Sequence, residues 1–404
     1  GISLGLSSLA TIFCSGVVQP TYMAQTLVTG CDSFPLMAVP FFILAGELMA
    51  TGGISRRLLN IADAFLGRKY GGLAHVTIVA CMFFAAISGS GPATVAAIGG
   101  LTIPTMIKQG YDTGYSGAIA AAAGSIGVVI PPSIPMVMYS VATGASVGAL
   151  FLGGIVPGLI IGLSLMLYTK WYCTKRQYIN KESQPFSWRT VGHSLADGIW
   201  ALLVPVIILG GIYGGICSPT EAATISIFYS LIVSLFIYRT IKIRDLPKIM
   251  LEGIHSYAPI LIILSAAVAF ARVITLMNVA TIVSEAVLSA ISSKVVILLL
   301  INVLLLFVGM IMDTGPAILV FTPVLLPVAE AIGVDPIHFG IIMCVNLAIG
   351  FVTPPMGANL FVASNLSKVS VFDIARKAVP FILAFLIALL LITFVPQISM
   401  FLLQ

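Results

Sequence analysis

Two proline pairs interrupt apolar stretches of this sequence and free backbone carbonyl groups that are able to bind a cation. The first pair lies in Gly124-Ser-Ile-Gly-Val-Val-Ile-Pro-Pro-Ser-Ile-Pro135. A proline has no amide proton for the carbonyl four residues earlier, so Pro131 frees the carbonyl of Gly127 and Pro132 frees that of Val128. Such carbonyls are costly in a bilayer unless protein, water or an ion meets them. A broken membrane helix that binds a cation and a proline kink satisfied by neighbouring helices both fit this motif.

The second pair repeats the first. It lies in Gly350-Phe-Val-Thr-Pro-Pro-Met-Gly-Ala-Asn359, where Pro354 and Pro355 free the carbonyls of Gly350 and Phe351. The offset between the pairs is 354 − 131 = 223, and it recurs from Gly110 to Gly333, Asp112 to Asp335 and Pro157 to Pro380. This shared spacing indicates an internal duplication. Equivalent broken helices in two halves point to the binding site of a secondary transporter.

Each half also contains a pair of apolar arms around a small polar tip. Arms at 73–87 and 92–107 flank Ser88-Gly-Ser-Gly91, and arms at 295–312 and 316–331 flank Asp313-Thr-Gly315. The first two arms are short for a full span, which favours a re-entrant helical hairpin. Helix-packing glycines are the alternative interpretation of Gly89 and Gly91, and the repeat favours the hairpin.

If both hairpins meet near the middle of the membrane, each tip faces its own broken helix. Each site is then a largely neutral cage of oxygen atoms, which suits a monovalent cation better than Ca²⁺. The cation-binding candidates are Ser88, Ser90, Gly127, Val129, Pro132, Thr314, Gly350, Thr353 and Met356. Helix starts at Pro92 and Pro316 direct positive dipole ends inward, toward an anionic substrate. The substrate candidates are Ser90, Ser133, Asp313, Thr314 and Asn359.

Acidic residues inside a membrane are rare and usually functional. Asp313, at the second tip, is the acid that we expect to serve the substrate or ion site. We expect Glu47 and Glu221 to pair within the structural scaffold instead.

The composition is that of an all-α polytopic membrane protein. The chain has 404 residues, of which 59% are hydrophobic and 8% charged, and its mean hydropathy is +1.13. The six cysteines include no C-x-x-C pair, so neither a disulfide framework nor a zinc site is supported. No enzyme or ATP-binding motif is present, so we expect no enzyme, no ATP-driven pump and no cofactor beyond a coupling ion. The net charge of +5 does not indicate a nucleic-acid partner, because the basic residues flank membrane segments.

We divide the chain into two inverted repeats. The first repeat, 1–172, has scaffold helices at 1–66 and a hairpin and broken helix at 73–143. A cytoplasmic linker follows at 173–198. The second repeat, 199–404, has scaffold helices at 199–291, a hairpin and broken helix at 295–366 and a final span at 378–402. The amphipathic segment 54–66, with Ile54, Leu58, Ile61 and Phe65 on its apolar face, is expected to lie along the membrane surface.

The distribution of basic residues supports the inverted arrangement. With the linker in the cytoplasm, all of the 19 Lys and Arg residues except Arg272 and Lys294 fall on the cytoplasmic side, as the positive-inside rule requires. The two halves then enter the membrane from opposite sides.

Several motifs resemble the large membrane subunit of TRAP transporters, the tripartite ATP-independent periplasmic systems. They are FPLMAVPFFILAGELM (34–49), GGISRRL (52–58), SGSGPATVAAIG (88–99), IPPSIPM (130–136), SPTEAA (218–223) and TPPMGANLFV (353–362). The resemblance covers essentially the whole chain. It departs at the N-terminus, where the chain starts at Gly1 and we expect a first span to be missing.

This resemblance implies a transporter of the bacterial inner membrane that imports an organic-acid anion with Na⁺ by an elevator motion. The implied substrates are of the C4-dicarboxylate or sialic acid class. The implied partners are a small four-helix membrane subunit and a periplasmic substrate-binding protein. A stand-alone ion-coupled exchanger or symporter of related two-hairpin architecture and a re-entrant channel are the alternatives. Strict dependence of transport on a binding protein would exclude the stand-alone exchanger or symporter. Saturable uptake driven by a Na⁺ gradient would exclude the channel.

The inverted topology predicts opposite labelling of two introduced cysteines. With the six native cysteines replaced by serine, Glu182→Cys should react with a membrane-impermeant maleimide only from the cytoplasm. Ser293→Cys should react only from the periplasm, because the linker and the loop before the second hairpin lie on opposite faces. Labelling of whole cells and of inverted vesicles measures this. Reaction of both from one side would rule out the inverted repeat.

Overall fold

The structure is a computed structural model that describes residues 1–404 except 17–18, 31, 67–69, 179–186 and 404. Every element in the described part is helical, and eight helices there are long and apolar enough to cross a membrane. The prediction of an all-α polytopic membrane protein is therefore confirmed. Arg68, Lys69, Lys181 and the middle of the predicted linker lie outside the described residues.

The N-terminal region contains α1 (Ile2–Ser15), α2 (Pro20–Thr29), α3 (Ala38–Thr51) and α4 (Ile54–Leu66), with a 3-10 turn, η1 (Phe34–Met37), leading into α3. The sequence predicts a polar, interfacial stretch between residue 14 and Asp32, and α2 lies within it. α4 coincides with the predicted amphipathic segment. It buries Ile54, Leu58 and Ile61 as expected, whereas Phe65 is 42% exposed and does not belong to the buried face.

The first hairpin consists of two arms with a sharp tip. Its first arm is α5 (Gly72–Ser88), and its second arm is continuous through α6 (Gly91–Thr94), a π-helical turn (Val95–Gly99) and α7 (Gly100–Lys108). Gly89 has a φ of 64° and ends α5, a conformation that glycine adopts without steric cost. Ser90 caps the second arm. The hairpin therefore forms where the small polar tip predicts it.

The first broken helix has two arms with an irregular break between them. The arms are α8 (Thr113–Gly124), which continues in a 3-10 turn (Ser125–Val128), and α9 (Ile134–Thr143). Asp112 caps α8, and Ser133 caps α9. The long helix α10 (Val147–Arg176) follows.

The segment between the two hairpin regions differs from the prediction at two places. It contains α11 (Trp188–Tyr213), α12 (Pro219–Ile232), α13 (Leu246–Leu276) and α14 (Val279–Ala290). Helix α11 starts inside the predicted linker 173–198, and α10 also reaches into it. The basic stretch 239–255 predicts an interfacial segment before a separate span at 257–271, but α13 joins the end of this stretch to the span. No C-terminal capping residue separates them, so the helix continues through Pro259.

The last region repeats the order of elements of the first hairpin region. The hairpin arms are α15 (Lys294–Ile311) and α16 (Thr314–Ala331), and the broken helix is α17 (Pro336–Gly350) and α18 (Ala358–Ser367). The final long helix α19 (Val371–Phe394) differs from the predicted span 378–402. Ser370 caps its start, and Pro396 follows its end, where α20 (Gln397–Met400) begins. The inverted relation of the two halves stays a prediction.

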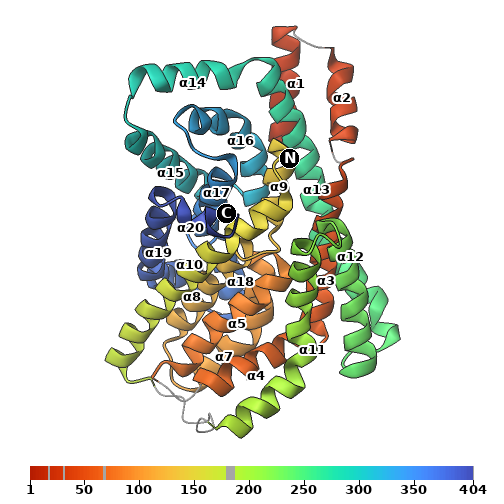
Figure 1. Cartoon of the computed structure of the whole chain (residues 1–404), viewed down its shortest axis with the longest axis vertical. Helices are drawn as coiled ribbons and strands as arrows, with labels where there is room; N and C mark the ends of the chain where they lie inside the picture. Colours follow the sequence, from red (N-terminus) through yellow and green to blue (C-terminus); the bar gives the residue numbers. More distant parts are fainter. Residues whose placement is uncertain (17–18, 31, 67–69, 179–186, 404) are drawn as a thin grey trace.

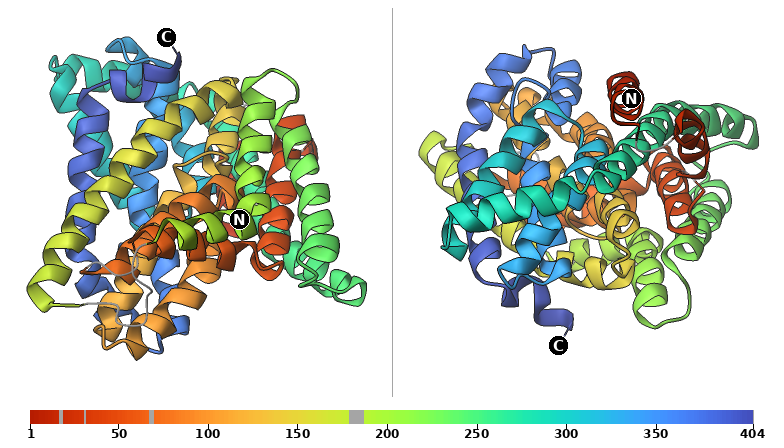
Figure 2. Two further views of the ribbon diagram at one scale, coloured as in Figure 1. Left: turned by 60° about the horizontal axis from the view of Figure 1, so that its bottom comes forward. Right: turned by 90° about the horizontal axis from the view of Figure 1, so that it is seen from above.

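The helices form two groups around a common core. Helix α3 packs against α12 and α13, and α11 packs against α4; in Figure 1, α3, α12 and α13 lie on the right and α4 at the lower centre. The hairpins, broken helices, α10 and α19 form the other group, and α14 lies across one end of the molecule. Seen from above, α1 lies at the outer edge (Figure 2). The small residues of α8 and the apolar residues of α17 are buried inside this second group, where α8 packs against α5, α18 and α19 and α17 packs against α15.

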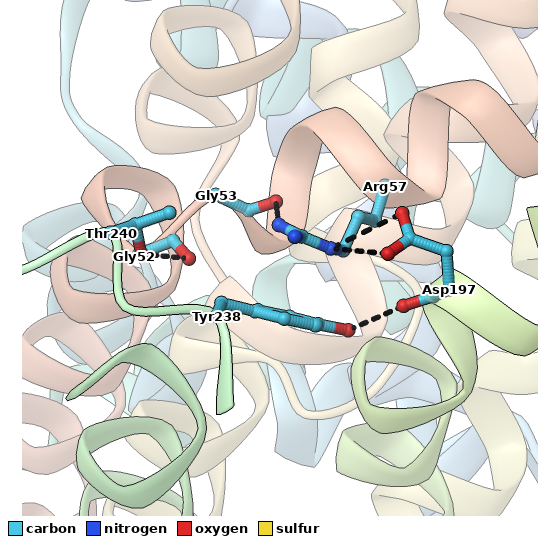
Figure 3. Close-up of polar contacts among 6 residues, drawn as sticks. All are labelled: Gly52, Gly53, Arg57, Asp197, Tyr238 and Thr240. Atoms are coloured by element: carbon cyan, nitrogen blue, oxygen red, sulfur yellow. Dashed lines mark hydrogen bonds and ion pairs between the residues drawn. The ribbon is translucent and has the colours of Figure 1, made fainter. Parts of the chain in front are cut away.

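A cluster around Arg57 joins three elements of the first group (Figure 3). The Arg57 guanidinium lies 3.4 Å from the centroid of the Tyr238 ring. Its Nε is 3.3 Å from a carboxylate oxygen of Asp197 on α11, and the Tyr238 hydroxyl donates to the Asp197 carbonyl at 3.0 Å. The Thr240 hydroxyl donates to the carbonyl of Gly52, just before α4, at 2.7 Å. The cluster fixes α4 against α11 and against residues 238–240, which follow α12 and the π-helical turn after it.

Arg57→Lys is expected to lower the free energy of unfolding by roughly 1–2 kcal/mol, because an ammonium group replaces neither the stacked guanidinium plane nor its fork of donors. The midpoint of thermal unfolding in detergent measures this. Arg244→Lys is the matched control, because Arg244 is exposed and lies 3.9 Å from its partner Asp245. Equal midpoints for both variants would contradict a stabilising role for the cluster.

Candidate functional site

The two hairpin tips line one central cavity of about 440 Å³. Helices α3, α9, α13 and α18 also line it, together with Val128 at the first helix break and Phe351 at the second. Among the substrate candidates Ser90, Asp313 and Thr314 lie in this wall, and so does the cation candidate Ser88. The described lining residues include no lysine, arginine or histidine; its two charged side chains are the carboxylates of Asp313 and Glu47.

The first tip contacts the first helix break through glycine positions. The amide of Ile134 donates to the Gly89 carbonyl at 3.2 Å. A Cβ on Gly127 would lie 2.6 Å from the Thr94 hydroxyl and 2.7 Å from the Ser90 carbonyl oxygen. Only glycine allows this approach without displacement of its neighbours. The structure thus brings together Ser90 and Gly127, as the sequence predicts.

Hydroxyl and carbonyl oxygens gather at this contact. The Ser88 and Thr94 hydroxyls lie 3.0 Å apart, and the Thr94 hydroxyl donates to the Ser90 carbonyl at 2.7 Å. Ser88 and Thr94 are buried. Sequence reasoning missed Thr94; its position four residues after Ser90, one helical turn, is the signal that would have found it. We call the oxygens of Ser88, Ser90 and Thr94 the first oxygen cluster.

The remaining candidates at the first break have structural contacts. The Ser133 hydroxyl donates to the Val128 carbonyl at 2.6 Å, so one carbonyl freed by the proline pair is met by protein. A Cβ added to Gly154 of α10 would lie 2.6 Å from the Val129 carbonyl oxygen. A Cβ added to Gly89 would lie 2.8 Å from the Pro132 carbonyl oxygen. Ser133 does not line the cavity.

The second break is also internally bonded. The Gly350 carbonyl accepts the Thr353 amide at 3.1 Å, and the Phe351 carbonyl accepts the Asn359 amide at 3.1 Å. The proline pair thus removes the helical donors of these two carbonyls, and amide groups of the turn meet the carbonyls instead, which is one of the outcomes that the sequence leaves open. Each carbonyl oxygen keeps a second lone pair for an ion.

The second break lies beside the first arm of the second hairpin. Gly350 is in close contact with Gly309 of α15, and the Met356 amide donates to the Met310 carbonyl at 3.0 Å. The Thr353 hydroxyl donates to the Ile349 carbonyl at 2.8 Å. Met356 is 48% exposed, whereas the residues of the first break are buried. The two breaks are therefore not equivalent in exposure.

Asn359 does not line the cavity, although it was a substrate candidate. Its amide nitrogen donates to the Ala121 carbonyl and to the Ser125 hydroxyl, both at 3.0 Å. Its side-chain oxygen lies 3.2 Å from where a Cβ on Gly91 would be, and the residue is fully buried. Asn359 connects the second broken helix to the first broken helix and the first tip.

The three acidic residues considered from the sequence have different surroundings. Asp313 caps α16 and accepts the Thr314 amide at 2.8 Å, so its charge lies at the positive end of a helix. Glu221 forms a capping box with Ser218 at the start of α12, which is a structural role as expected. Glu47 was expected to pair within the scaffold, but no described residue forms an ion pair or hydrogen bond with it.

Solved structures with the same fold are membrane transporters. The Alcanivorax borkumensis YdaH transporter aligns with a TM-score of 0.68 and 16% identity, covering 93% of this chain and 88% of its own. Neisseria gonorrhoeae MtrF aligns with a TM-score of 0.62 and 15% identity, covering 92% and 83%. At these identities the likeness shows the fold alone.

Sequence relatives identify the family. Residues 1–398 match the family described as "Tripartite ATP-independent periplasmic transporter, DctM component". The C4-dicarboxylate TRAP transporter large permease protein DctM of Pseudomonas aeruginosa is 40% identical over 398 residues, which cover 98% of this chain and 93% of that protein. The chain belongs to the DctM family of TRAP transporter large permease proteins, a family of the bacterial inner membrane.

A longer relative also matches across this chain. The isethionate TRAP transporter permease protein DctMQ of Oleidesulfovibrio alaskensis is 51% identical over 400 residues, which cover 99% of this chain but 63% of that protein. The sialic acid TRAP transporter large permease protein SiaM of Vibrio cholerae is 36% identical over 402 residues, covering 100% of this chain and 94% of SiaM. The family resemblance drawn from the motifs is thus confirmed.

Gly127→Ala is expected to separate the first tip from the first break, because its methyl group would overlap the Thr94 hydroxyl and the Ser90 carbonyl. Overpacking of this kind costs about 1–3 kcal/mol, and we expect uptake by the reconstituted transporter to fall at least about tenfold. Gly192→Ala is the control, since no atom lies within 4 Å of its added Cβ. Normal uptake by Gly127→Ala would contradict the close approach at the site.

Proposed function

We propose that this chain is the membrane subunit through which an organic-acid anion crosses the inner membrane together with Na⁺. The observation that carries the proposal is the central cavity, which both hairpin tips line and where the first oxygen cluster lies beside a broken helix. Buried hydroxyl and carbonyl oxygens without a nearby base are ligands for a hard cation of low charge.

The charges of the cavity favour a cation requirement. An organic anion that enters would meet two carboxylates, Asp313 and Glu47, and no basic side chain among the described lining residues. Like charges several ångströms apart repel by about 2 kcal/mol at an effective dielectric constant near 20. Bound cations and the positive end of α16 supply the compensating charge. Anion binding therefore depends on cation binding, which is the requirement for coupled transport.

We assign two Na⁺ sites. The first uses the first oxygen cluster and the backbone at Gly127, so it adds Thr94 to the residues expected from the sequence. The second uses the backbone at Gly350 and Met356 with the hydroxyls of Thr314 and Thr353. In this proposal both sites flank the anion, which would contact Ser90, Asp313 and Thr314, three residues that line the cavity.

The substrate class is a small organic-acid anion. Relatives are named for isethionate, C4-dicarboxylates, sialic acid and 2,3-diketo-L-gulonate, all of which carry a carboxylate or sulfonate. Since the relative with 51% identity is named for isethionate, a small sulfonate belongs among the candidates beside the dicarboxylates and sialic acid predicted from the resemblance.

Transport would proceed by an elevator motion with two partners. The hairpins and broken helices would move against α3, α4, α11, α12 and α13, which stay fixed. A small four-helix membrane subunit would pack on this fixed group, and a periplasmic substrate-binding protein would deliver the anion. Relatives named as large permease proteins of TRAP transporters support this assignment.

Loss of a site hydroxyl should weaken Na⁺ coupling. A missing contact at a buried cation costs roughly 1–3 kcal/mol, and about 1.4 kcal/mol is a tenfold change in affinity. Ser90→Ala and Thr353→Ala should each raise the Na⁺ concentration for half-maximal uptake about tenfold. Uptake into proteoliposomes that contain the small subunit, with binding protein outside, measures this.

The control for Thr353 is Thr105→Ala. The Thr105 hydroxyl makes the same bond to the carbonyl four residues earlier, at 2.8 Å, but outside the site. Its removal should leave the Na⁺ dependence unchanged. An unaltered Na⁺ dependence in both site variants would place the coupling ions elsewhere.

A further inference from the structure

A second hollow continues from the central cavity along α3. This groove of about 340 Å³ shares Gly46, Glu47, Ala93 and Ala96 with the cavity wall. Beyond the shared residues it is lined by Ala50 and Thr51 of α3 and by small and apolar residues of the first hairpin. The groove thus leads from the hairpin tips toward the C-terminal end of α3, where Arg56 and Arg57 of α4 follow. In the predicted topology this is the cytoplasmic side.

Glu47 lies at the junction of the cavity and the groove. It is the charged residue that the described linings of both hollows share. It projects from the C-terminal half of α3 rather than from a helix start, so no positive helix end offsets its charge, in contrast to Asp313 on α16. No described residue supplies it with an ion pair or hydrogen bond.

Glu47 also belongs to the group of helices that the proposed function holds fixed. Helix α3 packs on α12 and α13, whereas Ser88 and Ser90 belong to the hairpin that moves. The distance between the Glu47 carboxylate and a bound anion therefore changes during the transport cycle. A group that interacts more strongly with the ligand in one conformational state changes mainly the ligand affinity of that state.

We propose that Glu47 is an affinity-setting residue of the cytoplasm-facing state, which weakens anion binding where the cavity opens into the groove and so promotes release. The inference rests on the proposed function. Its basis is repulsion between two negative charges in a hollow with apolar walls, where Coulomb interactions are weakly screened. An anion that leaves through the groove passes Glu47, and re-entry by the same route meets the same repulsion.

The test compares affinity from the two sides of the membrane. Purified transporter with its small subunit is reconstituted, and binding protein is added outside, so that uptake reports on molecules that face outward and the lumen corresponds to the cytoplasm. Radiolabelled isethionate is the first probe and succinate the second. Two concentrations of the probe are measured. The first is the external concentration of labelled probe that gives half-maximal uptake, and the second is the concentration of unlabelled probe in the lumen that reduces uptake by half.

For Glu47→Gln, the lumenal concentration that halves uptake should fall about tenfold, because the anion rebinds more tightly without the carboxylate, while the external concentration changes less than about twofold. Glu47→Asp should retain the wild-type values, since it keeps the charge. Glu285→Gln is the control, because it removes an exposed carboxylate of α14 outside both hollows.

Ala50→Glu provides an independent variant if Glu47→Gln does not assemble. It places a second carboxylate in the groove and should raise the lumenal inhibitory concentration. No lumenal shift in the variants at both positions, or an equal shift on both sides, would overturn the role of Glu47. Absence of uptake of either probe by the wild-type protein would instead count against the proposed substrate class.

Discussion

The arrangement of the whole central region depends on the close backbone approach of the first hairpin tip to the first helix break. Gly127 lies so near Ser90 and Thr94 that a single added methyl group would overlap both. Gly89, on the other side of the tip, bonds through its carbonyl to the amide at the start of α9. The oxygen cluster and the shape of the cavity depend on this contact. A displacement of the tip away from the helix break would disrupt both the cluster and the cavity.

Local signals made the elements of this site predictable. The proline pairs, the small polar tips and the amphipathic pattern of α4 each specify a structure within a few residues, and the structure places the elements there. The helix ends were less predictable, since α13 continues through Pro259 and α19 stops before Pro396 for reasons of capping rather than hydropathy.

The roles of individual polar side chains were the least predictable part. Ser133, Asn359 and Thr94 are all small, neutral polar residues, yet Ser133 satisfies a carbonyl, Asn359 joins two helices and Thr94 completes the oxygen cluster. The carbonyl to which a hydroxyl donates depends on how the neighbouring helix is rotated about its axis. The sequence pattern does not specify this rotation. Glu47 is a similar case, because its contact with the cavity depends on how α3 faces the hairpins.

The position of Asn359 has a consequence for the origin of the fold. Its side chain extends from the second half into α8 of the first, next to the tip glycine Gly91. If the two halves descend from one duplicated segment, an ancestor of half this length would have presented the same surface at a subunit interface. A contact made between two separate chains would then have become an internal one, and each copy would have been free to specialise. Position 136, 223 residues before Asn359, is now a buried methionine, so the polar bridge is made from one side only.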